Sequence, residues 1–294
     1  MKKTFMLSLM CLTGIVLKAQ DPDLLRSLDS LPPTKEYTSS AFKSSRVING
    51  QSIEMIGKNT MDFRILHRFG PVNQGVKQFF GLDQASMRMG FDYGLTNNLT
   101  IGIGRSTLQK ELDGFIKFRP VRQSTGPGSS PVTVALVAGM AAITVESSLY
   151  KQTSDRMAYY YQAIVGRKFS SKFSLQLSPT LVHRNNVQPA DANDIYALGL
   201  GGRYKFSKRM AFVMDYFYVA NGLPKKQNYN PLSVGIDIET GGHVFQLHFS
   251  NASGMNERAF IAETTNDWGK GDIQFGFNLS RLFSFGKMKE GAKL

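Results

Sequence analysis

Cysteine is almost absent from this chain: Cys11 is the single thiol among 294 residues. It lies in a short apolar segment that we expect to be removed on export, which would leave the mature chain without a thiol. A disulfide scaffold, a cysteine zinc site and a cysteine nucleophile are therefore excluded. Long hydrophobic runs are scarce as well. The run Val132–Val145 has about 14 residues and contains Gly139, whereas a membrane-spanning helix needs about 20.

The first 19 residues have the pattern of a secretory signal peptide. Lys2 and Lys3 precede an apolar stretch that ends near Leu17, and Ala19 offers a small residue for cleavage. Met10 is too large to precede a lipoprotein cysteine, so ordinary cleavage after Ala19 is expected. The sequence therefore predicts an exported protein whose mature chain remains basic, since the whole chain has a formal charge of +13.

From Met61 onward, apolar and polar residues alternate with a period of two. Met87, Met89 and Phe91 alternate with Arg88 and Asp92, and many later segments follow the same rule. This alternation is typical of strands with one apolar and one polar face. Twelve such segments are predicted: 61–69, 84–95, 99–107, 112–119, 132–146, 157–169, 173–184, 194–206, 210–220, 232–239, 243–250 and 271–285.

Segment length and the connections predict how these strands are arranged. Most segments are close to the roughly 9–11 residues that a tilted strand needs to cross a bilayer. Short turns such as Thr96–Asn98 alternate with long connections such as Asn251–Lys270. The sequence thus predicts an all-β fold, a closed antiparallel up-and-down transmembrane β-barrel with short periplasmic turns and longer extracellular loops. Two connections fit poorly, because Leu108–Glu111 is short for a loop and Pro120–Pro131 is long for a turn.

A soluble periplasmic barrel is the alternative to a membrane barrel. Twelve strands enclose a space that single side chains fill poorly, which argues against an apolar interior. The polar face also carries more charge than a merely solvated face requires. Aromatic residues gather near the strand ends, as in the girdles of membrane barrels: Tyr159, Tyr161, Tyr196, Tyr204, Tyr216, Tyr218, Phe283 and Phe285. These features favour lipid outside the barrel.

The chain divides into four parts on this interpretation. Residues 1–19 are the signal peptide and residues 20–60, polar and weakly periodic, are a periplasmic N-terminal arm. Residues 61–285 form the barrel, and residues 286–294 are a polar periplasmic tail with three lysines. The sequence leaves open whether the arm enters the barrel.

Several segments resemble those of an uncharacterised outer-membrane β-barrel family of Gram-negative bacteria, filed as a domain of unknown function. They are Phe79–Asp83, Pro179–Asn185, Asp237–Phe249 and Phe275–Asn278, and the resemblance extends from about Val47 to Phe285. It implies a porin-like barrel in the outer membrane and assigns no activity.

The polar face supplies the candidate functional residues. The predicted lumen set is Arg64, Arg68, Arg88, Asp92, Arg184, Arg203, Lys205, Asp215, Asp237, Glu239, His248 and Asp272. These charges could form cross-strand pairs in a filled structural barrel, or line a narrow small-solute channel with weak anion preference. Phe79 and Phe80, in the first long loop, are a candidate constriction or cap of the lumen, with a partner-docking patch as a further reading.

No residues are predicted to be catalytic, to bind a cofactor or to bind a metal. His243 and His248 point to opposite faces of one strand and cannot chelate one ion. A lipid-acting enzyme with a Ser–His–Asn site needs an outward serine beside His67 or His183, and none is expected there. The expected partners are outer-membrane lipid and lipopolysaccharide. An alternative is a scaffold whose residues 20–60 dock a periplasmic or lipoprotein partner; nucleic acid is not expected, because the charges are dispersed along an exported barrel.

Overall fold

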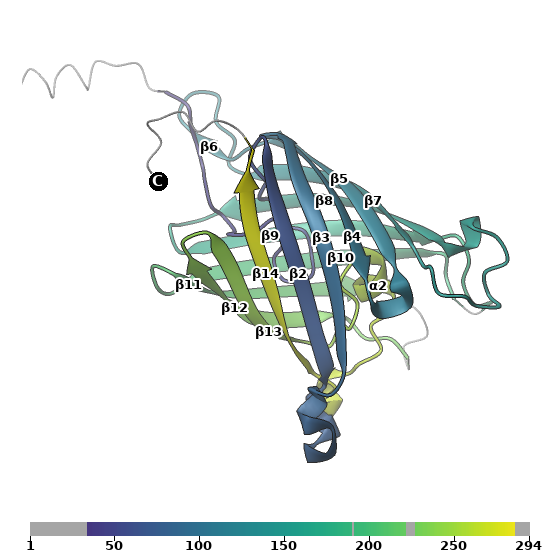
Figure 1. The fold of residues 1–294 in the computed structure, drawn as a ribbon. Helices are drawn as coiled ribbons and strands as arrows, with labels where there is room; N and C mark the ends of the chain where they lie inside the picture. Colours follow the sequence, from purple (N-terminus) through teal and green to yellow (C-terminus); the bar gives the residue numbers. More distant parts are fainter. Residues whose placement is uncertain (1–33, 190, 222–226, 286–294) are drawn as a thin grey trace, which may run out of the picture.

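Twelve antiparallel strands close into a barrel in the computed structural model, which describes residues 34–189, 191–221 and 227–285 (Figure 1). The barrel strands are β2 (Thr60–Pro71), β3 (Ala85–Thr96), β4 (Leu99–Ser106), β5 (Leu112–Val121), β7 (Thr133–Ala142), β8 (Met157–Lys168), β9 (Phe173–Arg184), β10 (Asp194–Lys205), β11 (Met210–Val219), β12 (Leu232–Thr240), β13 (His243–Ser250) and β14 (Gln274–Ser284). Each pairs with its neighbours along the chain, and β14 closes the ring against β2.

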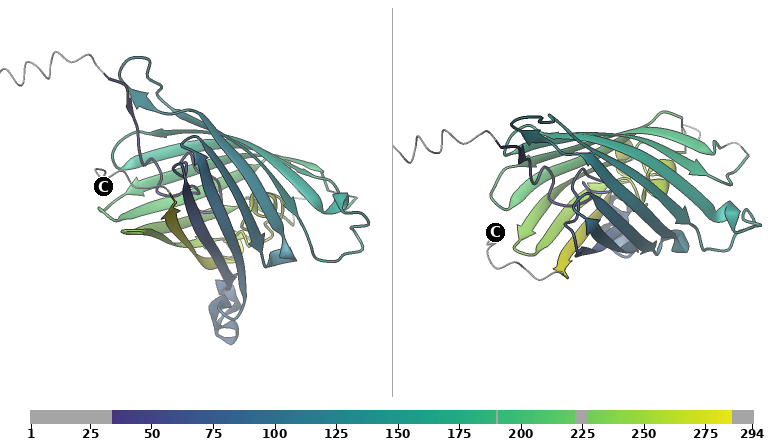
Figure 2. Two further views of the ribbon diagram at one scale, coloured as in Figure 1. Left: turned by 45° about the horizontal axis from the view of Figure 1, so that its top comes forward. Right: turned by 90° about the horizontal axis from the view of Figure 1, so that it is seen from above.

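The strands match the twelve predicted segments, and the predicted fold class is confirmed. Figure 2 shows the ring of slanted strands from two further directions. We call the end where β2 begins and β14 ends the turn end, and the opposite end the loop end. The predicted signal peptide (1–19) and tail (286–294) lie outside the described residues. No helix in the described part of the chain is long and apolar enough to span a membrane.

The irregular connection between β5 and β7 has a structural role. Within it, β6 (Ser124–Thr125) pairs with β1 (Glu36–Tyr37), and this small sheet lies outside the barrel at the turn end. The Thr38 backbone N–H also donates to the Gln123 carbonyl oxygen over 2.9 Å. The connection is therefore long because it holds the chain that leads to β2. The other irregular connection, between β4 and β5, is compressed into the short 3-10 helix η3 (Leu108–Lys110).

The two faces of the barrel wall differ as the period of two requires. Large apolar side chains on the outer face are exposed, among them Ile103, Ile116, Leu136, Leu177, Tyr196 and Tyr218. Alternate residues of the same strands face inward and are buried, although many are charged. An exposed apolar wall around a charged interior is the inverse of a soluble barrel and suits a lipid environment.

Two inward segments fill the barrel. Residues 41–56, which we call the plug, precede β2 and are largely buried, with Ile48 and Ser52 fully enclosed. Residues 251–264, which we call the inner loop, connect β13 to β14 and contain the short helix α2 (Glu257–Ala262), whose residues are all buried. The predicted N-terminal arm spans residues 20–60, of which 20–33 lie outside the described residues. The sequence left open whether the arm enters the barrel, and residues 41–56 lie inside it. A polar sequence suits that place because its partners there are polar.

Candidate functional site

The plug is a tight hairpin whose tip reaches the barrel wall. The Val47 N–H donates to the Gly50 carbonyl oxygen over 2.8 Å, and the Ser52 N–H donates to that of Ser45 over 2.9 Å. At the tip, one carboxylate oxygen of Asp215, on β11, accepts the backbone N–H groups of Ile48, Asn49 and Gly50 over 3.2, 2.7 and 2.9 Å. Three donors converging on one buried carboxylate hold the tip against the wall.

Side-chain amides from three other strands satisfy the plug's carbonyl groups. Gln246 donates to the Val47 oxygen over 2.6 Å, Asn278 to the Ile48 oxygen over 3.1 Å and Gln176 to the Gln51 oxygen over 2.7 Å. The Lys117 ammonium donates to the carbonyl oxygens of Ser45 and Glu54 over 3.2 and 2.7 Å. The lumen wall therefore supplies to this non-repetitive segment the partners that a sheet would otherwise supply.

A small apolar core holds the plug and the inner loop in the barrel. Phe42, Val47 and Ile53 belong to the same buried cluster as Phe217 and Phe260. The ring of Phe217, on β11, meets the ring of Phe260, on α2, edge to face at 5.0 Å. A Cβ atom on Gly50 would lie 2.8 Å from the Phe217 ring, so the plug tip passes this ring only as glycine.

Most charges inside the barrel are paired. Arg64 pairs with Asp62 on the same strand, and Arg88 with Asp113 two strands away. Arg203 pairs with Glu239 at 3.0 Å. A Cβ atom at Gly104 would lie 2.2 Å from the Arg88 guanidinium, so glycine makes room for that side chain. The pairs lower the cost of burying so many charges, because an unpaired buried charge is strongly destabilising.

The structure places most of the predicted lumen residues inside the barrel. Buried there are Arg64, Arg68, Arg88, Asp92, Arg184, Arg203, Asp215, Asp237 and His248. Lys205 and Glu239 are partly exposed near the turn end, where Glu239 also pairs with Lys43 at 3.1 Å. Their placement is consistent with the predicted face, while their role in transport stays a prediction.

Two predicted placements are wrong. Asp272 precedes β14, which begins at Gln274, and its carboxylate accepts a hydrogen bond from Asn73 over 2.6 Å in an exposed loop. The alternation continues back through Asp272, but its side chain bridges two loops. Phe79 and Phe80 neither constrict nor cap the lumen. They are 60% and 53% exposed on the 3-10 helix η2 (Val76–Gly81), which projects beyond the strands (Figure 1).

Several interior charges were missed by the sequence reasoning. Asp62, Asp113, Lys117 and Arg119 lie on β2 and β5 and face inward. Their alternation with Phe63, Gly114, Ile116 and Phe118 carries the signal that would have found them. Arg46 and Glu257 carry no such signal, because neither lies on a strand.

A buried ion pair joins the plug to the inner loop. The Arg46 guanidinium lies 2.9 Å from the Glu257 carboxylate, and each side chain is only 1% exposed. Next along α2, Arg258 pairs with Glu111 at 2.6 Å, and Asn256 donates to the same carboxylate over 2.8 Å. Burial raises the pKa of the Glu111 carboxyl, while Arg258 and Asn256 oppose this effect. The plug is thus bonded to a loop that belongs to the opposite end of the barrel.

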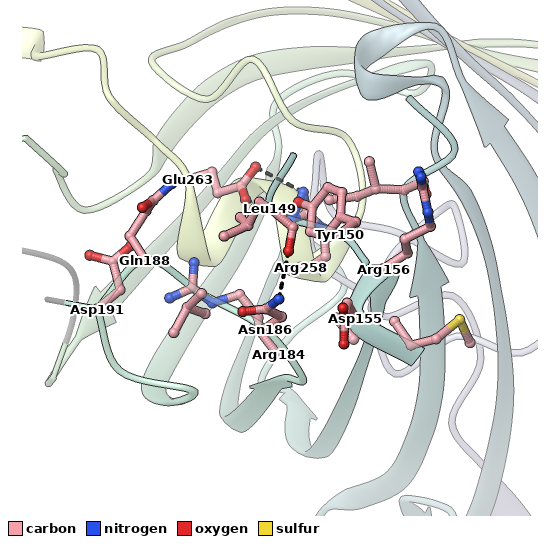
Figure 3. Close-up of a pocket in the computed structure, with 14 residues that line it drawn as sticks. Leu149, Tyr150, Asp155, Arg156, Arg184, Asn186, Gln188, Asp191, Arg258 and Glu263 are labelled. Carbon is pink, nitrogen blue, oxygen red and sulfur yellow. Dashed lines mark hydrogen bonds and ion pairs between the residues drawn. The ribbon is translucent and has the colours of Figure 1, made fainter. Parts of the chain in front are cut away.

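A cavity of about 120 Å³ lies at the loop end, beside α2. Its walls come from the β7–β8 and β9–β10 connections, the adjoining ends of β8 and β9, and the inner loop. Figure 3 shows Arg184, Gln188 and Asp191 on one side and Tyr150 and Arg156 on the other. Arg258 and Glu263, paired at 2.6 Å, line the cavity on the side of the inner loop. We call this space the loop-end cavity.

Its side chains differ in how far they are already bonded. Asp155 accepts the backbone N–H groups of Lys151 and Gln152 over 2.9 and 3.0 Å. Arg184 is 7% exposed and donates to the Ala192 carbonyl oxygen over 2.8 Å, but its Nε has no partner in the described structure. Burial raises the pKa of the Tyr150 hydroxyl, which therefore stays protonated. No group of three or more metal-binding side chains occurs among the described residues.

Comparison with protein families identifies the barrel. A family model described as a membrane-bound β-barrel domain, DUF5777, matches residues 42–283. The chain belongs to this family. The resemblance to an uncharacterised barrel family is thereby confirmed, and the matched region begins within the plug and ends within β14. The plug is therefore part of the family's domain rather than an appendage of this chain.

The solved structures to which the chain is similar include two porins and an outer membrane channel. They include the NanC porin (8% identity, 77% of this chain and 99% of that chain, TM-score 0.46) and the KdgM porin (10%, 77% and 99%, TM-score 0.44). An outer membrane channel from Pseudomonas putida F1 has 12% identity, covers 79% of this chain and 98% of its own, and has a TM-score of 0.47. No curated protein matches the sequence.

Proposed function

We propose that this protein is a non-enzymatic, gated small-solute channel of the outer membrane, closed when the plug occupies the barrel. The observation that carries the proposal is the way the plug is held. Its tip is bonded through backbone groups to Asp215 and to wall amides, in a lumen rich in charge. Water can replace each of these hydrogen bonds once the plug moves, so the net cost of exchange is modest. An apolar plug would need an apolar wall around it, and such a wall would not line a hydrated path once the plug moved.

The charges of the wall support a weak anion preference in the open state. Buried strand residues number seven cationic (Arg64, Arg68, Arg88, Lys117, Arg119, Arg184 and Arg203) against five anionic (Asp62, Asp92, Asp113, Asp215 and Asp237). The small excess of positive charge would favour anions without excluding cations. The basic chain and the predicted signal peptide agree with export to the outer membrane, where lipid and lipopolysaccharide would surround the barrel.

The decisive experiment locks the plug by a reversible bond. A Cβ atom at Gly201, on β10, would lie 3.0 Å from Val47 Cγ2 in the plug, which suits a disulfide between cysteines at the two positions. The variant Val47→Cys/Gly201→Cys is made in a Cys11→Ser background, so no other thiol is present. Currents are then recorded in planar bilayers before and after reduction, with each single-cysteine variant as control.

The expected result is silence from the oxidised protein and stepwise currents after reduction. Reversal potentials in a salt gradient then test the anion preference. Equal currents in both states would show that the plug is not the gate. Silence in both states, with the barrel folded, would reject the channel.

A second candidate function rests on the small sheet at the turn end. The β1–β6 pair lies outside the barrel and holds Tyr37 54% exposed, between Lys35 and Arg122. A periplasmic or lipoprotein partner could bind there, which would make the protein a scaffold. Co-purification of a defined partner that is lost in a Thr38→Pro variant, but kept in Thr38→Ala, would support this alternative.

A further inference from the structure

The loop-end cavity has a composition that narrows what it could hold. Three cationic side chains line it, Arg156, Arg184 and Arg258, and three anionic ones, Asp155, Asp191 and Glu263. Its formal charge is therefore balanced. An ion of either sign would meet three like charges as well as three opposite ones, which favours a neutral occupant.

The polar groups around the cavity are of both kinds. The Arg184 side chain lines the cavity, is more than nine-tenths buried, and has an enclosed Nε–H group without a partner among the described residues. The Tyr150 hydroxyl can donate and accept, and the Asp191 carboxylate can accept. Hydroxyl groups match such a surface because each can donate to a carboxylate while accepting from a guanidinium. A ligand that carries several hydroxyl groups would use donors and acceptors together.

Size sets a second limit on the occupant. A space of about 120 Å³ approaches the roughly 150 Å³ of a cavity that holds one benzene ring. The occupant is therefore limited to a single six-membered ring, such as that of one six-carbon sugar. The Tyr150 ring adds an apolar surface to the cavity. The Arg156 guanidinium carbon lies over this ring, 5.4 Å from its centroid, and helps to fix its position. A longer oligosaccharide could place only one unit in the cavity.

We propose that the loop-end cavity binds one neutral monosaccharide unit, with Arg184 and Tyr150 as its principal hydrogen-bonding residues. This site would be the first point at which a solute meets the closed barrel. Its role in transport rests on the proposed channel function. The site is close to the plug contact, since Arg258 and Glu257 are consecutive on α2 and Glu257 is bonded to the plug. A ligand beside Arg258 would thus lie one residue from the contact that holds Arg46.

The proposal is tested by saturation-transfer NMR on the full mature protein in lauryldimethylamine oxide, a detergent without a sugar group. The probes are glucose, galactose and mannose at millimolar concentrations, with glucuronate and glutamine as charged and zwitterionic comparisons. We expect transfer to at least one neutral hexose and at least fivefold weaker transfer to glucuronate. Arg184→Gln should lower the hexose signal at least fivefold, and Tyr150→Phe should lower it measurably.

The matched control is Arg105→Gln, which removes an exposed arginine of the outer wall that donates to the Lys110 carbonyl oxygen over 2.9 Å. It should leave the hexose signal unchanged, and heat-modifiable migration in gels should show that every variant is folded. The proposal is overturned if no neutral hexose receives saturation, if Arg184→Gln binds as well as the wild type, or if glutamine or glucuronate gives the stronger signal. Binding by a protein that never conducts would reject the channel alone, and a conducting protein that ignores hexoses would reject the site alone.

Discussion

At the residue scale, the position of the plug inside the barrel depends on a few polar side chains, each of which bonds to several backbone groups. Asp215 accepts three backbone N–H groups of the plug tip with one oxygen atom. Lys117 bonds to plug carbonyl groups on both sides of the hairpin. Such contacts are directional, so they define one position for a segment that has little regular structure of its own.

Replacing Asp215 should release the plug tip. In Asp215→Asn the converging N–H groups lose the charge that they share, and an amide N–H₂ group competes for the same space. We expect a loss of about 1–3 kcal/mol in the free energy of unfolding, together with a higher open probability. Urea titration in micelles and bilayer recording measure the two effects. Asp83→Asn, in an exposed loop, is the matched control; equal effects of both substitutions would contradict the assignment.

At the scale of elements, the plug and the inner loop together occupy the interior of the barrel and contact each other. They enter from different ends of the barrel and meet through the Arg46–Glu257 pair and the shared apolar cluster. The short helix α2 is also capped from its own chain, since the Asn256 side chain accepts the Ala259 N–H over 2.9 Å. Movement of one segment must therefore disturb the other.

Breaking the Arg46–Glu257 pair should be costly, and replacing it as a whole much less so. Arg46→Met alone leaves a buried carboxylate without its partner and should cost about 3–5 kcal/mol of unfolding free energy. The double variant Arg46→Met/Glu257→Leu should recover most of that loss, because both buried charges are gone. A double-mutant cycle from urea titrations measures the coupling. Simple addition of the two single effects would show that the residues act independently.

The β1–β6 sheet should anchor the chain that precedes the plug without stabilising the barrel. Thr38→Pro removes the N–H group that bonds to Gln123, and the site is at the surface. We expect several-fold faster proteolysis within residues 34–40 and a change in barrel stability within about 0.5 kcal/mol. Thr38→Ala keeps the N–H group and should match the wild type. Unfolding of the whole barrel by the proline variant would show that the small sheet belongs to the core.

At the scale of the whole molecule, the barrel is apolar outside and charged inside. This arrangement is stable only where lipid covers the outer wall, since exposed side chains such as Ile103 and Ile116 would otherwise face water. Closure of β14 on β2 leaves no unpaired edge in the ring, which a lipid environment also requires.

A charge on the outer wall therefore tests the orientation of the barrel. Ile116 lies in the middle of β5 and is 56% exposed. Ile116→Arg should cost about 2–4 kcal/mol in lipid vesicles, as expected for arginine near the middle of the bilayer. Ser148→Arg, in an exposed loop, should have almost no effect. If both substitutions were harmless, the outer wall would not face lipid.

The period-two pattern determined much of the fold without reference to tertiary structure. It determines which residues face inward, and so it placed Arg88 and Asp237 in the interior. Applied without omission, the same pattern would have placed Asp62 and Lys117 there. Asp272 and Phe79 show its limit, because in loops the direction of a side chain depends on its contacts rather than on its parity.

The sequence by itself determined the number of strands and their two faces, while export and the loss of the single thiol stay predictions. These follow from local patterns, each contained in about ten residues. Only the tertiary structure decided that residues 41–56 fill the barrel and that a loop from the other end joins them. The Asn278 side chain and the Ile48 carbonyl oxygen are 230 positions apart in the chain, yet they form one hydrogen bond. No local pattern encodes that contact, because the backbone groups of the plug find their hydrogen-bond partners only when the closed ring of strands surrounds them.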